Sequence, residues 1–165
     1  MPLNLELKIK VESHSKLLKV LRRINAEKKS ILRQKDVYYK TKNGLLKLRI
    51  EGNNFTLIKY LRDENGKRWS NYELLRLEGK NPEKYLNDIF NIDTIVEKKR
   101  ILYLYKNTRI HLDEVKGLGK FLELETLLVT TRKDAEERFR EIIKLLNLDL
   151  LKQIRTSYKF LMLGK

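Results

Sequence analysis

The stretch from Leu3 to Glu12 alternates apolar and polar residues without interruption. Because successive side chains of a β-strand point to opposite faces, its odd positions form an apolar face and its even positions a polar one. The polar face carries both signs of charge. One strand of this kind is typical of the wetted outer face of an antiparallel sheet. The pattern returns in later segments, however, and its repetition constrains the whole fold.

Later strand-like segments also oppose an apolar face to a charged one. If helices cover the apolar faces, the charged faces meet inside a closed barrel. Such an interior is costly unless a ligand matches its charges. A metal bound to carboxylates, with phosphate oxygens bound to Lys or Arg, meets this requirement. We expect these side chains to converge on one cavity: Glu6, Lys8, Lys47, Arg49, Lys98, Arg100, Glu123 and Glu125.

Capping and helical spacing predict three helices outside this sheet. They span Ser13 to about Glu27, a short segment after Asn81, and a longer one after Thr131. Hairpin turns at residues 41–44, 51–54 and 63–66 separate strand-like runs. The expected strands are residues 3–12, 37–40, 45–51, 55–61, 69–77, 94–105, 109–115 and 121–130, with 156–163 closing or padding the sheet. The pattern predicts one α+β domain over residues 1–165, a closed or nearly closed eight-stranded antiparallel β-barrel with helices packed outside.

Composition limits the ligands. The chain has 165 residues, 41% of them hydrophobic, and no cysteine. Disulfides and thiolate metal sites are therefore excluded, which favours hard cations such as Mg²⁺ or Mn²⁺. A net charge of +15 attracts nucleic acid, anionic membranes or small polyphosphates. Without a long apolar stretch or a signal-peptide pattern, we expect a cytoplasmic monomer or homodimer with no membrane partner.

A series of short motifs runs along nearly the whole chain. The first is Asn4-x-Glu6-x-Lys8, and the others are 35–39, 46–49, 98–100, 110–115, 117–125 and Ser157-Tyr158. In this order they resemble the CYTH superfamily, the triphosphate tunnel metalloenzymes that include class IV adenylyl cyclases and thiamine triphosphatases. The stretch from Arg109 to Glu125 is similar to the class IV cyclase branch. The resemblance implies an eight-stranded tunnel that binds a triphosphate with a divalent metal.

The resemblance also implies roles at matching positions. The metal ligands for Mg²⁺ or Mn²⁺ would be Glu6, Glu73, Asp113, Glu123 and Glu125. The substrate-binding residues would be Lys8, Lys10, Lys47, Arg49, Lys59, Lys98, Arg100 and Arg109, with Lys8 and Glu6 as the catalytic residues. His111 would either line the tunnel or pack. Asn4 and Asn71 stand where the family has carboxylates, so we expect the metal site to have lost negative charge.

Two reactions fit such a cavity. In hydrolysis, water attacks the terminal phosphorus of a triphosphate; in cyclisation, the ribose 3′-hydroxyl of ATP attacks the α-phosphorus and pyrophosphate leaves. We favour hydrolysis because it demands less of the site, with tripolyphosphate, thiamine triphosphate or ATP as substrate. The rival is a polyphosphate or RNA binding module, because basic residues cluster between Lys16 and Arg33. That segment has no interleaved aromatics for stacking on bases, so nucleic acid is not favoured.

Overall fold

The computed structural model describes residues 3–62 and 69–164. The turn expected at 63–66 lies outside them. Eight strands are present in the described part of the chain: β1 (Leu3–Val11), β2 (Glu27–Tyr39), β3 (Leu45–Glu51), β4 (Asn54–Arg62), β5 (Trp69–Leu77), β6 (Ile92–Tyr105), β7 (Thr108–Val115) and β8 (Gly119–Leu127). The helical elements are α1 (Ser15–Arg23), α2 (Pro82–Ile89), α3 (Arg132–Leu145), the 3₁₀ turn η1 (Leu150–Lys152) and α4 (Tyr158–Leu163). Among the residues described, no helix has the length and apolar character needed to cross a membrane.

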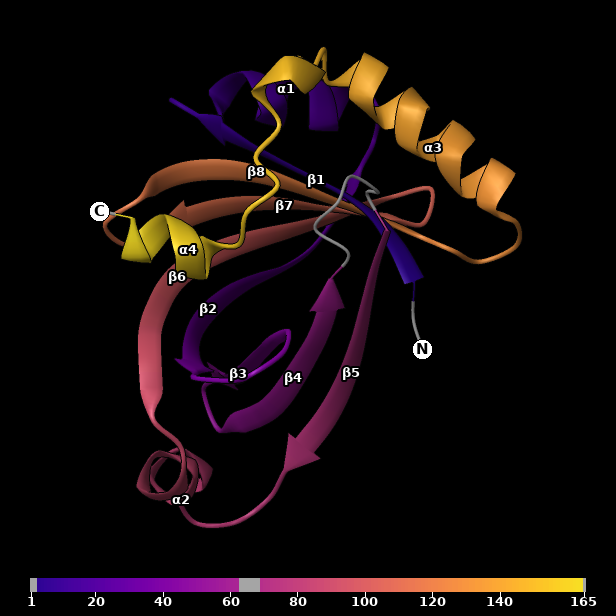
Figure 1. The fold of residues 1–165 in the computed structure, drawn as a ribbon. Coiled ribbons are helices and arrows are strands. Elements are labelled where there is room, and N and C mark those ends of the chain that lie inside the picture. The colour runs from indigo at the N-terminus through magenta and orange to yellow at the C-terminus, as the bar shows by residue number, and fades with distance from the viewer. Residues whose placement is uncertain (1–2, 63–68, 165) are drawn as a thin grey trace.

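The strands form a barrel in the order β1-β5-β4-β3-β2-β6-β7-β8, with all neighbours antiparallel. Its seam between β1 and β5 is short, running only from the pair Leu3 and Asn71 to the pair Leu5 and Trp69. Beyond these pairs β5 diverges from β1, and the sheet opens into a curled half-barrel (Figure 1). The predicted fold, a nearly closed eight-stranded antiparallel barrel in an α+β protein, is confirmed.

Helices cover the outer face, as the alternation predicts. The apolar positions of β1, such as Leu7, pack with Leu21 of α1 and Phe139 of α3 in one buried cluster. Helix α3 begins after Thr131, whose hydroxyl accepts a hydrogen bond of 3.1 Å from a backbone N–H in the first turn. On the other side of the barrel, α2 buries Leu86 against apolar residues of β2 and β3. The helices lie outside the sheet (Figure 1), and the faces of the strands opposite these apolar positions are left to the interior.

The C-terminal segment forms a helix, so the strand expected at residues 156–163 is wrong. A short apolar run does not distinguish a strand from a buried helix by periodicity. Tyr158 packs edge-on against Phe121, with ring centroids 5.0 Å apart, in a cluster that includes Tyr38 and Val96. Lys159 pairs with Asp93 at 2.5 Å. These contacts fix α4 against the interior of the barrel.

The boundaries of α1 and β2 also differ from those expected. Helix α1 ends at Arg23 rather than near Glu27, and β2 begins at Glu27 rather than at Val37. Asn25 takes a φ of 53°, a left-handed conformation that asparagine tolerates and that turns the chain between the two elements. The first half of β2 lacks apolar alternation and is held by β6, from the pair Glu27 and Leu104 onward.

Candidate functional site

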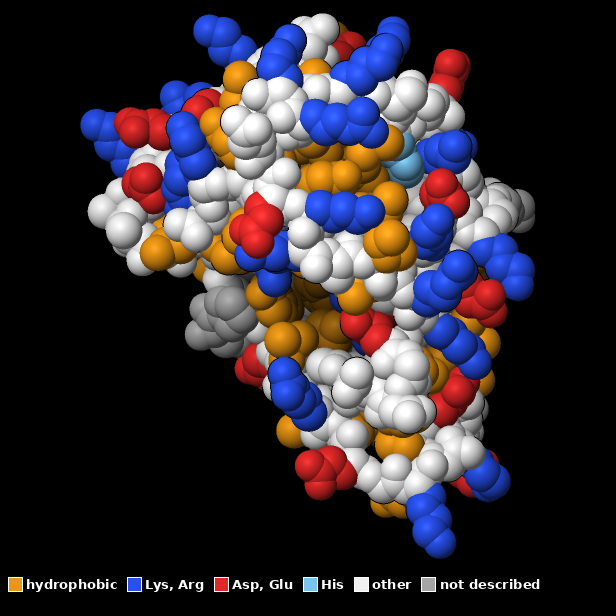
Figure 2. Space-filling model, turned by 180° about the vertical axis from the view of Figure 1, so that it is seen from behind, with side chains coloured by type: hydrophobic (Ala, Val, Ile, Leu, Met, Phe, Trp, Pro, Cys, Tyr) orange, Lys and Arg blue, Asp and Glu red, His pale blue; other side chains and the backbone are white. Residues whose placement is uncertain are grey.

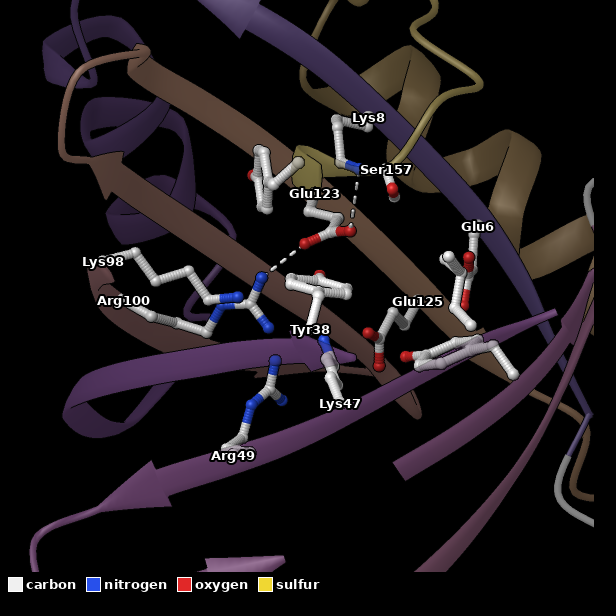
Figure 3. Close-up of a pocket in the computed structure, with 13 residues that line it drawn as sticks. Glu6, Lys8, Tyr38, Lys47, Arg49, Lys98, Arg100, Glu123, Glu125 and Ser157 are labelled. Atoms are coloured by element: carbon white, nitrogen blue, oxygen red, sulfur yellow. Dashed lines mark hydrogen bonds and ion pairs between the residues drawn. The ribbon is translucent and has the colours of Figure 1, made fainter. Parts of the chain in front are cut away.

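One charged cavity lies inside the barrel. It has an empty volume of about 510 Å³, counted out to its open mouth, and is lined by side chains from six strands and from the start of α4 (Figure 3). All eight residues expected to converge line it: Glu6, Lys8, Lys47, Arg49, Lys98, Arg100, Glu123 and Glu125. Leu45, Tyr38, Tyr60, Ser157 and Tyr158 complete the lining. The alternation therefore predicts where these side chains point, while their chemical roles remain predictions.

A fully buried carboxylate, Asp36, organises three of the cations. It accepts hydrogen bonds from Lys47 at 3.0 Å, from Arg49 at 2.8 Å through two nitrogens, and from Lys98 at 3.3 Å. Burial alone would raise the pKa of Asp36, but Arg49, Lys47 and Lys98 hold it well below its usual range. Because three cations share one carboxylate, this part of the cavity keeps an excess of positive charge.

Burial and neighbouring cations lower the pKa of the two lysines beside Asp36. Burial, with repulsion from Arg49 and Lys98, lowers the pKa of Lys47 to about 7 despite the attraction of Asp36. Burial likewise lowers the pKa of Lys98 to about 8, with Arg100 and Arg49 adding repulsion. An anion in the cavity would favour the charged form of both lysines, so binding of a polyanion should be coupled to proton uptake.

A second buried carboxylate orients Arg100. Both oxygens of Asp113 accept from the Arg100 guanidinium, at 2.7 and 2.6 Å, and one of them also accepts from the Tyr158 hydroxyl at 2.8 Å. Arg100 additionally donates to Glu123, which lies 3.7 Å from the ammonium of Lys8. Burial opposes ionisation of Glu123, but Lys8 and Arg100 hold its pKa well below the usual range. Glu123 is thus a carboxylate at neutral pH.

Several predicted site residues are not brought to the cavity. Lys59 lies opposite Leu46 in the β3–β4 ladder, on the outer face, and pairs with Glu73 at 2.7 Å. Their side chains are 48% and 50% exposed. Lys10 is also exposed, and Asp113 lies behind Arg100 rather than on the lining. We therefore leave the predicted metal role of Glu73 and the predicted substrate roles of Lys59 and Lys10 out of the site.

The closed end of the barrel holds further polar groups. Arg109 pairs with Glu125 at 2.6 Å, next to the cavity but not on its lining. His111 is buried, its ring nitrogens have no hydrogen-bond partner in the described part of the chain, and burial lowers its pKa to about 3 with repulsion from Arg100. Asn4 is 1% exposed, and its amide likewise has no partner among the residues described. The side chain of Asn71 lies outside the description.

The glutamates of the cavity fit a hard divalent cation in their chemistry. Glu6 and Glu125 are directly paired between β1 and β8, where like charges repel, and Glu123 lies two residues from Glu125 on the same face. Carboxylate oxygens are the donors that Mg²⁺ and Mn²⁺ prefer. Within residues 3–62 and 69–164, no set of three or more acidic or histidine side chains is already arranged around a metal position. Glu6, Glu123 and Glu125 are the residues that would hold one.

Sequence reasoning assigned no site role to Asp36, Tyr38, Tyr60 or Ser157, although the family-like motifs contain Asp36, Tyr38 and Ser157. Asp36 stands among cations, but only the β2–β3 register shows that it lies opposite Arg49. Tyr38 and Tyr60 follow the inward period of their strands, and this alternation is the signal that would have found them. Ser157 comes from the segment expected as a strand, and its position depends on α4.

A nearly closed barrel with cations and carboxylates on its inner wall has the architecture of a tunnel with a charged interior. The family model described as "CYTH domain" matches residues 3–158, so the chain belongs to the CYTH family. The resemblance seen in the motifs is thereby confirmed.

Individual relatives agree with this assignment. The protein named "Putative adenylate cyclase MJ0240" of Methanocaldococcus jannaschii is 27% identical over 173 residues, which cover 94% of this chain and 96% of that protein. The structure of the PH1012 protein from Pyrococcus horikoshii OT3 has a TM-score of 0.79 at 20% identity, covering 96% and 98% of the two chains. The adenylyl cyclase-like protein HpAC1 from Hippeastrum, described as having a dominant triphosphatase activity, has a TM-score of 0.71 at 14% identity, covering 100% and 97%. At these identities the two structures establish the shared fold.

Proposed function

We propose that this chain is a divalent-metal-dependent enzyme that hydrolyses a triphosphate bound inside the barrel. The observation that supports this best is the lining of one cavity by five cations next to three glutamates. The five cations are Lys8, Lys47, Arg49, Lys98 and Arg100. Charge-assisted bonds from Lys and Arg to phosphate oxygens are among the stronger hydrogen bonds in proteins, and a tripolyphosphate offers such oxygens along its whole length.

In this proposal the residues divide into two groups. Glu6, Glu123 and Glu125 would hold a divalent cation, which supplies charge neutralisation and a bound water of lowered pKa. Arg100, fixed by Asp113, would donate to the oxygens of the phosphate under attack. Lys8, beside Glu123, would stabilise the negative charge that develops on that phosphate during the reaction. Because Arg100 is already oriented, little reorganisation is needed when the reaction begins.

Relatives support two outcomes of the same binding mode. The triphosphatase activity described for the Hippeastrum protein favours hydrolysis, and the name of the Methanocaldococcus relative favours cyclisation of ATP. A binding module for RNA is the third possibility. On the face shown in Figure 2, Lys and Arg side chains are spread from the upper helices to α2 at the bottom, with no single basic track. This spread agrees better with a solvated basic surface than with an RNA groove.

Product analysis tests the proposal. The protein is incubated with tripolyphosphate, thiamine triphosphate or ATP, plus Mg²⁺ or Mn²⁺, and phosphate, pyrophosphate and cyclic AMP are resolved. We expect phosphate release that falls by about a hundredfold or more in Glu123→Gln, because a ligand charge is lost at almost constant volume. Glu73→Gln is the control, since Glu73 lies on the outer face, and it should leave turnover unchanged.

Two outcomes contradict hydrolysis. Cyclic AMP with pyrophosphate would assign the chain as a cyclase. If no product forms with either metal while tripolyphosphate still raises the melting temperature, the tunnel binds polyphosphate without processing it.

A further inference from the structure

Ser157 presents a buried hydroxyl on the cavity wall. The residue is 9% exposed, and in the part of the chain that the structure describes its Oγ has no hydrogen-bond partner. It lines the same cavity as Lys8 and Glu123, and Figure 3 shows it next to Lys8. A buried hydroxyl without a partner has lost its hydration and gained nothing in exchange. A bound ligand could supply the hydrogen-bond partner that this hydroxyl lacks.

Ser157 also lacks the hydrogen bond that a serine at its position in the chain ordinarily makes. Ser157 is the N-cap residue of α4, with φ −73° and ψ 161°. A serine at this position ordinarily accepts a hydrogen bond from a backbone N–H of the first helical turn. Here the side chain makes no such bond. Ser157 therefore leaves the helix without a side-chain cap and lies on the cavity lining instead.

Contacts on both sides hold Ser157 in place. Before it, the backbone N–H of Ile154 donates to the carbonyl of Lys8 at 2.8 Å, and the Lys8 ammonium donates to the carbonyl of Thr156 at 3.1 Å. After it, the Tyr158 hydroxyl donates to Asp113 at 2.8 Å. The hydroxyl is thus presented from a fixed backbone, and little ordering would be needed to use it.

The surroundings of Ser157 select the kind of ligand. The ammonium of Lys8 lies 4.2 Å from the centroid of the Tyr158 ring, and that of Lys98 lies 5.2 Å from it. Ammonium groups are donors only, so they favour a ligand rich in acceptor atoms at this wall. A hydroxyl among such donors can give its own hydrogen to the same ligand. Phosphate oxygens, which are anionic and accept several hydrogen bonds each, meet both requirements.

We infer that Ser157 is a substrate-binding residue that donates a hydrogen bond to a phosphate oxygen of the bound polyphosphate, next to the Lys8 ammonium. This role rests on the proposed function, because it needs a polyphosphate in the cavity. It adds a neutral donor to a set otherwise made of cations. Unlike Lys47 and Lys98, this donor does not titrate near neutral pH.

The test compares Ser157→Ala with wild type in two measurements without turnover. Calorimetric titration with sodium tripolyphosphate in EDTA gives the Kd, and thermal unfolding without ligand gives the Tm. Ser157→Ala should weaken tripolyphosphate by about tenfold to a hundredfold, the loss of one hydrogen bond to a charged acceptor. Its ligand-free Tm should be unchanged or higher, because the substitution removes a buried polar atom that has no partner.

Control variants separate this role from a structural one. Ser157→Thr keeps a hydroxyl and should retain most of the affinity, while Ser30→Ala, half-buried on β2 and off the cavity lining, should change neither measurement. A Ser157→Ala protein with wild-type Kd, or one whose ligand-free Tm falls together with its affinity, overturns the inference. If wild type binds no tripolyphosphate in EDTA, the inference fails; if it also releases no phosphate from tripolyphosphate with Mg²⁺ or Mn²⁺, the proposed function fails with it, which distinguishes that case from a failure of Ser157 alone.

Discussion

Replacing Asp36 by asparagine removes a buried negative charge that is bonded to three cations of the cavity. The carboxylate is fully buried and bonded to Lys47, Arg49 and Lys98. Asparagine keeps the volume but leaves the three cations facing one another. Removing one partner of a buried ion pair costs about 3–5 kcal/mol. At about 2–4 °C per kcal/mol for a domain of this size, the Tm of the ligand-free protein should fall by about 6–20 °C.

The outer face supplies a matched control for this substitution. Glu73 also accepts from a lysine, at 2.7 Å compared with 3.0 Å for Asp36 and Lys47, but its side chain is 50% exposed and that of Asp36 is 1% exposed. Exposed pairs contribute about 0–1 kcal/mol. Glu73→Gln should therefore leave the Tm within a few degrees of wild type. If the N–O distance determined the effect on the Tm, the two variants would behave alike. If burial of the carboxylate determines it, only Asp36→Asn should lower the Tm strongly.

The pH dependence gives the reasoning a second check. Because the folded pKa of Asp36 is depressed, its stabilisation is present above the unfolded value of about 4 and is lost as pH falls through the folded pKa. As pH rises past about 7 and 8, Lys47 and Lys98 lose their protons and the benefit of Asp36 shrinks again. The stability difference between wild type and Asp36→Asn should therefore be largest between about pH 5 and pH 7.

Thermal unfolding of the two variants and wild type, measured in EDTA from pH 3 to pH 9, decides the matter. The reasoning is refuted if Asp36→Asn costs no more than Glu73→Gln at pH 6, or if its cost is constant across that range.

Two predictions concern ligands directly. Tripolyphosphate affinity in EDTA should fall as pH rises above about 7, by up to about tenfold per pH unit for each proton taken up, because Lys47 and Lys98 bind an anion in their charged forms. Titrations in buffers of different ionisation enthalpy would measure that uptake, and no uptake at pH 8 would contradict it. Asn4→Glu should lower the ligand-free Tm, since it adds a buried charge near Glu6, and should increase the Tm gain from Mn²⁺. An unchanged Mn²⁺ response would place residue 4 outside the metal site.

Alternation predicts the interior of the barrel well because a strand has only two faces. Once Leu46, Leu48 and Ile50 are taken as the outer face of β3, Lys47 and Arg49 must point inward, and the cavity confirms this direction. The same logic fails on β5, where Leu74 and Leu75 are both exposed. No apolar face separates inside from outside there, so the sequence alone does not decide the side of Glu73. Its register with Lys59 on β4 does.

Features that depend on long-range contacts could not be predicted. The early part of β2 is a strand because β6 pairs with it. The sequence of residues 27–36 contains no local pattern that predicts this pairing. The helix α4 replaces an expected strand because Tyr158 finds Phe121 and Asp113 on distant strands. Asp36 and Ser157 lie in the family-like motifs but received no site role for the same reason, since only the fold brings their neighbours to them.

The two buried aspartates and the three lining glutamates answer different needs of one cavity. Asp36 and Asp113 are bonded to the cations but do not line the cavity, so Arg49 and Arg100 are oriented without a ligand. Full neutralisation would leave nothing for a ligand to gain. Because Asp36 is shared by three cations, repulsion among cations persists, and it adds to burial in lowering the pKa values of Lys47 and Lys98. In the proposed function a bound polyphosphate would relieve that repulsion, and the free energy of relief would add to the free energy of binding. A smaller anion such as single phosphate reaches fewer of these groups, so the site should discriminate by the number of charges that its ligand brings.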